Sequence, residues 1–191
     1  MLFTKTKYRD VHHQLIANCK KGDQMAQVEI YKLYYKAMYN SALRILKNQA
    51  DAEDVMQDSF LDAFTRIHLY REDGSFGGWL KRITINNAMD VFRKQKPTDE
   101  IDEDLLLLTD EKEDCIENDC RLEDIKMAMK KIKEEYHIIL SLYLFEGYDH
   151  EEIASILKIS YGLSRTRYSR ARQSLLNVIN QLQTEREMRW A

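Results

Sequence analysis

Residues 147–176, GYDHEEIASILKISYGLSRTRYSRARQSLL, decide the fold, because they read as two short helices meeting at a tight turn. The first helix begins with acidic side chains, where the helix dipole favours negative charge. Its compact apolar stripe consists of Ile153, Ala154, Ile156 and Leu157. The turn is made by residues 158–160, and a basic segment follows. The pattern predicts a helix-turn-helix, the form that enters a DNA major groove.

The second helix of this pair is predicted to begin at or just after Ser160, a suitable N-cap. From Lys158 to Asn177 the chain has no acidic residue, which suits a polyanionic partner. At about 100° per residue, one side carries Leu163, Arg167, Ala171 and Leu175 and is expected to pack inward. The outward positions available for bases and phosphates are Arg165, Thr166, Ser169, Arg170 and Arg172. The alternative is a solvated basic helix on an ordinary bundle.

The composition predicts a mainly helical protein, since one proline and six glycines accompany 32% charged and 44% hydrophobic residues. The net charge of −3 conceals a strong asymmetry. Residues 1–97 carry 16 basic and 11 acidic side chains, residues 98–120 carry one and 11, and residues 121–191 carry 12 and 10. Two mildly basic blocks therefore flank an acidic connector, and the local charge permits nucleic-acid binding despite the acidic total.

Several classes of function are disfavoured by the sequence. No apolar run is long enough to cross a membrane and the N-terminus lacks a signal-peptide core, so we expect no membrane insertion and a cytoplasmic location. Cys19 stands alone, and Cys115 with Cys120 lack a second ligand pair, so neither a metal nor another cofactor is expected. The chain also lacks a phosphate-cradling glycine loop and a recognisable nucleophile, so we do not expect an enzyme.

The expected architecture is all-α, with two small helical bundles joined by an acidic linker. We place an N-terminal domain at residues 1–97, the linker at 98–120 and a C-terminal domain containing the helix-turn-helix at 121–191. The linker is interrupted by Leu105–Leu108, which is either a docking anchor or one buried helical turn. In the C-terminal domain we expect helices over residues 122–132 and 136–144, and a frayed tail from Glu185.

The N-terminal block begins with a long apolar helix, residues 24–47, which we expect at the centre of a bundle. The next helix, residues 51–68, has an apolar face and an acidic face, the latter formed by Asp51, Glu53, Asp54, Asp58 and Asp62. Asp58 and Asp62 lie too far along the helix for the dipole to explain them. This face is either solvated or a docking surface for a basic partner.

A glycine-bearing loop, residues 70–78, precedes a helix predicted over residues 79–94. Lys81, Arg82 and Arg93 make this part basic, and Asn86 and Asn87 add amides. Aromatic rings beside cations and amides are typical of single-stranded nucleic-acid binding. Without the rest of the chain, however, Phe76 and Trp79 are better interpreted as core residues.

In combination, three segments resemble the extracytoplasmic-function (ECF) sigma factors of bacterial RNA polymerase, over about residues 15–182. DAEDVMQDSFLDAF, residues 51–64, is similar to the family's polymerase-binding helix. SFGGWLKRITINNAMDVFRK, residues 75–94, is similar to its segment for recognising and opening the downstream promoter element. EGYDHEEIASILKISYGLSRTRYSRARQSL, residues 146–175, is similar to its upstream-element reader.

The resemblance implies that core RNA polymerase binds the first segment through a coiled coil of its largest subunit, with Asp51, Asp54, Gln57, Asp58 and Phe60 as contacts. It implies that the loop at 70–78 receives a flipped base, with Lys81, Arg82, Asn86, Asn87 and Arg93 near melted promoter DNA. Upstream duplex DNA would meet Arg165, Thr166, Arg167, Ser169, Arg170 and Arg172. An anti-sigma factor is a further implied partner, and no reaction is catalysed.

The chain departs from the family at the start of its recognition helix, where Leu163 and Ser164 replace the usual threonine and valine, and at Gly77 and Gly78, where bulkier polar residues are common. Two other functions are considered. A helix-turn-helix regulator would use residues 1–97 for oligomerisation or sensing and would not bind core polymerase. A helical adaptor that binds only proteins would leave the arginines of residues 165–172 unexplained.

Overall fold

The computed structural model describes residues 10–95 and 122–190, and the chain divides into two compact units, Met1–Pro97 and Thr98–Ala191. Every regular element within these two ranges is helical, so the all-α prediction is confirmed. No helix among the described residues is both long and apolar enough to cross a membrane. The predicted acidic linker, with Leu105–Leu108, Cys115 and Cys120, lies outside the described residues.

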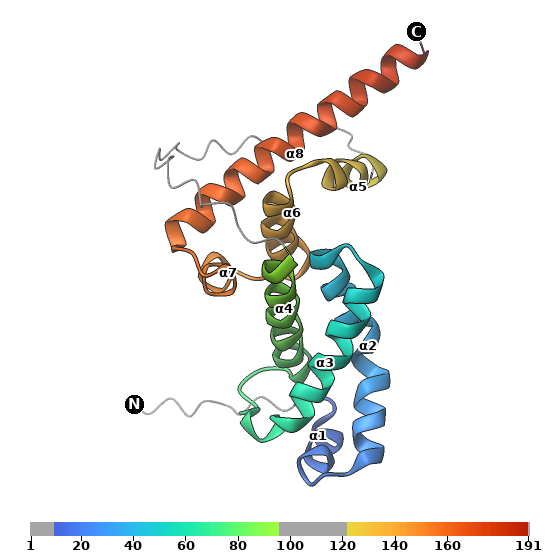
Figure 1. Ribbon diagram of the computed structural model, residues 1–191, viewed down its shortest axis with the longest axis vertical. Helices are drawn as coiled ribbons and strands as arrows, with labels where there is room; N and C mark the ends of the chain where they lie inside the picture. Colours follow the sequence, from blue (N-terminus) through green and yellow to red (C-terminus); the bar gives the residue numbers. More distant parts are fainter. Residues whose placement is uncertain (1–9, 96–121, 191) are drawn as a thin grey trace. The chain divides into compact units, whose positions relative to one another are not determined.

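The first unit is built on three long helices that pack against one another (Figure 1). Its elements are α1 (His13–Lys20), α2 (Gln24–Leu46), α3 (Gln49–Thr65), the 3₁₀ turn η1 (Ile67–Leu69) and α4 (Phe76–Gln95). Ile30, Met38 and Phe60 are among the buried side chains between them. As predicted, α2 is the central helix of the unit, since it packs on α1, α3 and α4.

Side-chain caps define the start of α2 and of α3. Asp23 accepts hydrogen bonds from the backbone N–H groups of Met25 (2.9 Å) and Ala26 (3.3 Å). The Asn48 side chain accepts a hydrogen bond from the backbone N–H group of Ala50 at 2.9 Å. Lys47, in the left-handed conformation with φ 55°, ends α2 immediately before this cap. Each cap satisfies amide groups that have no partner within their own helix, so the chain can reverse direction between α2 and α3 in two residues.

The start of α4 differs from the prediction, because the helix begins at Phe76 rather than near Trp79. Gly77 and Gly78 therefore lie in the first turn of a helix, not in the preceding loop. The amide of Gly78 donates to Oγ of Ser75 at 3.1 Å, which caps this turn. A Cβ added at Gly77 would lie 2.8 Å from Cε1 of Tyr34, so glycine allows the ring on α2 to approach the backbone of α4.

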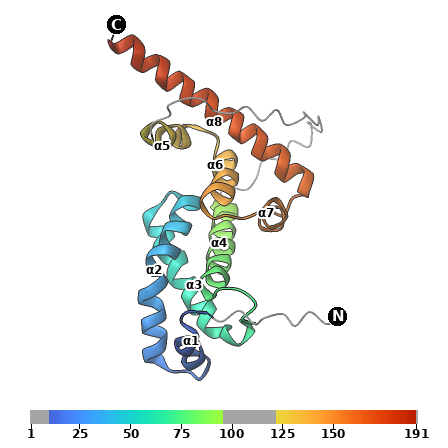
Figure 2. The ribbon, with the colours of Figure 1, turned by 180° about the vertical axis from the view of Figure 1, so that it is seen from behind.

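The second unit contains α5 (Leu122–Lys131), α6 (Glu134–Leu140), the π-helical turn η2 (Ser141–Phe145), α7 (His150–Leu157) and α8 (Tyr161–Trp190). The long α8 packs on α5, α6 and α7 (Figure 2). The prediction of a frayed tail is wrong, because α8 continues to Trp190. Arg186 in this last part forms an ion pair with Asp124, which is 1% exposed, and this tertiary contact stabilises the helix beyond Glu185.

Candidate DNA-binding and polymerase-binding surfaces

The helix-turn-helix has the boundaries that the sequence predicts. Asp149 accepts a hydrogen bond from the amide of Glu152 (2.8 Å), and the Glu152 carboxylate accepts one from the amide of Asp149 (3.2 Å), which forms a capping box at the start of α7. Lys158, with φ 58°, ends α7 in the left-handed conformation. Oγ of Ser160 accepts a hydrogen bond from the amide of Leu163 at 3.2 Å and caps α8.

His150 connects the two helices of this motif, a role that the sequence did not reveal. Its Nδ1 lies 3.1 Å from Oγ of Ser164 on α8, within hydrogen-bond distance. Its ring stacks on Tyr143 at a centroid distance of 5.0 Å and meets Tyr168 edge-on at 5.3 Å. These contacts set the placement of α8 against α7. Tyr143 and Tyr168 belong to η2 and α8, so the periodicity of α7 alone could not have identified the cluster.

The inward face of α8 differs from the prediction only in the first part of the helix. Ser164, Ala171 and Leu175 are buried, whereas Leu163 and Arg167, which we expected inside, are half-buried. A small serine can lie at this contact because its hydroxyl meets His150. Ala171 and Leu175 lie on the inner face as predicted.

The predicted upstream DNA contacts lie on α8 with unequal exposure. Arg165 and Ser169 are exposed. The remaining four are half-buried: Thr166, Arg167, Arg170 and Arg172. The hydroxyl of Thr166 donates to the carbonyl oxygen of Gly162 at 3.0 Å, so part of its hydrogen-bonding capacity is used within the helix. Arg165 and Ser169, one turn apart, form the most accessible pair of candidate contacts.

On α3, most of the predicted polymerase contacts form one exposed polar surface. Asp54, Gln57 and Asp58 are exposed, and Asp51 is half-buried with its carboxylate accepting a hydrogen bond from the Gln95 side chain at 2.9 Å. Phe60 is different, because it is 3% exposed and packs against Tyr31 at a centroid distance of 4.8 Å. Its prediction as a direct contact is wrong for this structure, since its ring belongs to the core.

Asp62, which the helix dipole does not explain, has an internal role. The Asn87 side-chain amide on α4 donates to Asp62 at 3.2 Å and to Oγ of Ser59 at 3.3 Å. Asn87 was predicted to lie near melted DNA, but its amide joins α4 to α3. Asp62 is therefore part of the helix packing, and the exposed acidic side chains of α3 are Glu53, Asp54 and Asp58.

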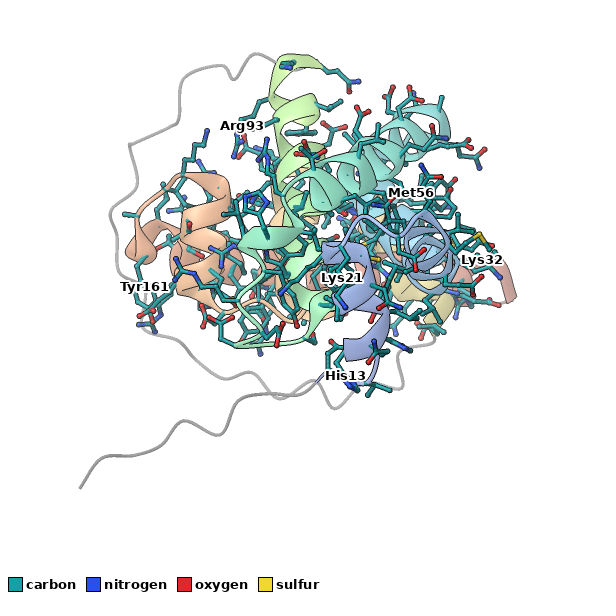
Figure 3. All side chains as sticks on the ribbon, turned by 90° about the horizontal axis from the view of Figure 1, so that it is seen from below. His13, Lys21, Lys32, Met56, Arg93 and Tyr161 are labelled. Atoms are coloured by element: carbon teal, nitrogen blue, oxygen red, sulfur yellow. The ribbon has the colours of Figure 1, made fainter. Side chains whose placement is uncertain are left out.

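The other predicted downstream contacts remain on the outer side of α4. Arg82 and Asn86 are exposed, and Lys81 is half-buried. Arg93, also half-buried, pairs with Asp90 at 2.9 Å. Its position on α4 is visible in Figure 3. Arg82, Asn86 and Arg93 lie on one side of α4 at helical spacing, and Lys81 is adjacent to Arg82 in the sequence.

The aromatic residues around this loop form its core, as the sequence favoured. Phe76 is fully buried, with ring centroids 5.4 Å from Tyr70 and 5.5 Å from Trp79. Trp79 is half-buried. The exposed part of the loop consists instead of Arg71, Asp73, Gly74 and Ser75.

Comparison with known proteins agrees with this arrangement. The Sigma-70 region 2 family matches residues 30–98, and the Sigma-70 region 4 family matches residues 122–175. The ECF RNA polymerase sigma factor SigE of Mycolicibacterium smegmatis is 33% identical over 163 residues, covering 81% of this chain and 63% of SigE. SigW of Bacillus subtilis is 28% identical over 179 residues, covering 87% of this chain and 96% of SigW.

Among solved structures, CnrH in complex with the cytosolic domain of CnrY has the same fold, with a TM-score of 0.57. It is 22% identical and the match covers 90% of this chain and 98% of CnrH. Two helical units, the second with a helix-turn-helix, define a DNA-binding transcription factor. The chain belongs to the ECF sigma factors. These proteins bind core RNA polymerase and direct initiation at promoters, and they are initiation factors rather than enzymes.

Proposed function

We propose that residues 1–97 bind core polymerase and open the downstream promoter element, that residues 121–191 read the upstream element, and that residues 98–120 link the two. The observation that carries this proposal is the opposite charge of two exposed helical surfaces. Asp54 and Asp58 project from α3, where promoter DNA would be repelled, whereas Arg165 lies exposed on α8 in a segment free of acidic residues. One surface suits a basic protein partner and the other suits a polyanion.

The downstream surface of α4 would hold the melted strand without any chemical step. Lys81, Arg82 and Arg93 supply positive charge, and Asn86 supplies an exposed amide for a base edge. Binding to unpaired bases offsets the few kcal/mol that extrusion of a base costs. The protein would therefore act in the cytoplasm as a binding factor, with no catalysis. By analogy with the sigma factor RpoE of Bartonella quintana, whose solved structure is a complex with the anti-sigma factor NepR, we propose that a protein of the anti-sigma class regulates it.

Reconstitution with purified core polymerase tests this function. The full chain is mixed with core enzyme, passed over gel filtration at physiological salt, and used to transcribe genomic fragments. We expect co-elution and transcripts that begin at a small set of sites, whereas core enzyme alone should give neither. DNA binding without co-elution would instead indicate a helix-turn-helix regulator, and co-elution without transcripts would contradict the promoter-reading role.

A further inference from the structure

The loop between η1 and α4 is held at its α4 end by Asp10, which precedes the matched region 2. One carboxylate oxygen of Asp10 accepts a hydrogen bond from the amide of Phe76 at 2.8 Å, across 66 residues of sequence. The other accepts one from the amide of His12, also at 2.8 Å. Asp10 is 7% exposed, so these charge-assisted bonds are shielded from water. The first turn of α4 is thereby fixed to the N-terminal segment.

Lys20 holds the other end of the same loop. Its ammonium group donates to the carbonyl oxygen of Tyr70 at 3.1 Å and pairs with the Glu72 carboxylate at 2.9 Å. It also lies over the Tyr70 ring, 5.4 Å from the centroid. Lys20 is the last residue of α1, the helix that runs between the labelled residues His13 and Lys21 in Figure 3. The N-terminal segment therefore contacts the loop at two points.

Between these two points the loop has a conformation that needs support. Glu72 has φ 60°, a backbone region that L-residues rarely adopt without compensation. The Tyr70 hydroxyl donates to the carbonyl oxygen of Gly74 at 2.6 Å, which closes the loop on itself. The backbone on both sides of the exposed residues 71–75 is therefore fixed, by Lys20 at one end and by Asp10 at the other.

We propose that Asp10 and Lys20 are positioning residues that set the base selectivity of the loop at residues 70–75. This inference rests on the proposed function, in which that loop receives a flipped promoter base. Selective contacts require donors and acceptors placed to within a fraction of an ångström, and a loop released at either end would lose this placement. The N-terminal segment, which lies outside the region 2 match at residues 30–98, thereby becomes part of the promoter-reading machinery.

The test uses reconstituted holoenzyme and a randomised single-stranded DNA library, from which bound strands are sequenced. The variants are Asp10→Asn, which keeps the shape but removes one acceptor, and Lys20→Met, which keeps the stem but removes the charge. Lys32→Met is the matched control, because Lys32 forms a comparable pair with Glu29 on α2 away from the loop. We expect both loop variants to retain core binding while base enrichment at the selected position falls by about tenfold.

A charge exchange provides rescue and guards against a folding artefact. Lys20→Glu should lose selectivity, and adding Glu72→Lys should restore part of it by rebuilding the pair. Unchanged enrichment in both Asp10→Asn and Lys20→Met would overturn the inference, as would an equal loss in the Lys32→Met control. Wild-type holoenzyme that enriched no base would instead refute the proposed promoter-opening function itself, so the two failures are distinguishable.

Discussion

The ring of Tyr34 on α2 lies directly against the backbone of Gly77 on α4, at a distance that leaves no room for a side chain. An added Cβ would be 2.8 Å from Tyr34 Cε1. Phe76 and His12 also pack near the Tyr34 ring, with centroids at 5.8 and 6.0 Å, so it has little freedom to withdraw. This close contact joins α2 to the first turn of α4, which directly follows the loop at residues 70–75.

Gly77→Ala is therefore expected to destabilise the first unit by about 1–3 kcal/mol, as overpacking does elsewhere. The measurement is chemical unfolding of the full chain, followed by Trp79 fluorescence in a Trp190→Phe background. Gly74→Ala is the matched control, because a Cβ there meets nothing within 4 Å. Equal stability of the two variants would show that Tyr34 can move aside.

Replacing Arg165 and Arg170 with alanine should weaken binding to the upstream promoter element by about 1–3 kcal/mol for each lost base contact. The measurement is the affinity of holoenzyme for duplex promoter fragments, together with footprinting. Lys130→Ala, an exposed cation on α5, is the control and should leave affinity unchanged. Wild-type footprints from the double variant would contradict the placement of α8 in the groove.

Reversing the charge at Asp54 and Asp58 should release core polymerase. Two lysines on α3 would face a basic partner surface, and like charges brought together at an interface are costly. We expect the affinity for core enzyme to fall at least about tenfold, measured by gel filtration or titration. The control combines Glu185→Lys with Glu187→Lys, an equal charge change at two exposed positions on α8. Retained core binding would mean that the acidic surface is only solvated.

Removing the Arg186 side chain should destabilise the second unit, because Asp124 would remain buried without its partner. We expect Arg186→Met to cost about 2–3 kcal/mol, less than a fully buried pair because Arg186 is partly exposed. Hydrogen exchange of the α5 amides measures the effect. Arg186→Lys should cost less, and Glu187→Ala in the same turn should cost little. If Arg186→Met left the hydrogen exchange of the α5 amides unchanged, the last turns of α8 would contribute nothing to stability.

Burial, assisted by the negative charge of Asp23, raises the pKa of the Cys19 thiol above its usual value of 9.0. The folded state then keeps the proton while the unfolded state releases it, so stability should fall as pH rises above about 9. Cys19→Ala should make this decline shallower, as measured by urea unfolding between pH 7 and pH 10. Parallel pH profiles for the two proteins would contradict the shifted pKa.

Much of the secondary structure could be predicted from the sequence pattern. Helical periodicity predicted α2, α3 and α8, and the acidic start and basic continuation of residues 147–176 predicted the helix-turn-helix with its turn at Lys158 to Ser160. Capping groups at Asp149 and Ser160 act within a few residues of their own position. Local signals were sufficient here because the hydrogen bonds that define these elements are themselves local.

The remaining features arise from contacts between residues far apart in the chain. Ser164 on α8 is buried against His150 on α7, and the Phe76 amide at the start of α4 donates to Asp10, 66 residues earlier in the sequence. Phe60 belongs to the core, and Asp62 is occupied by Asn87. Periodicity assigns a residue to a side of a helix, but the partner that approaches that side is set by packing between helices. Long-range packing therefore determines which of the polar and aromatic side chains remain available for DNA and polymerase.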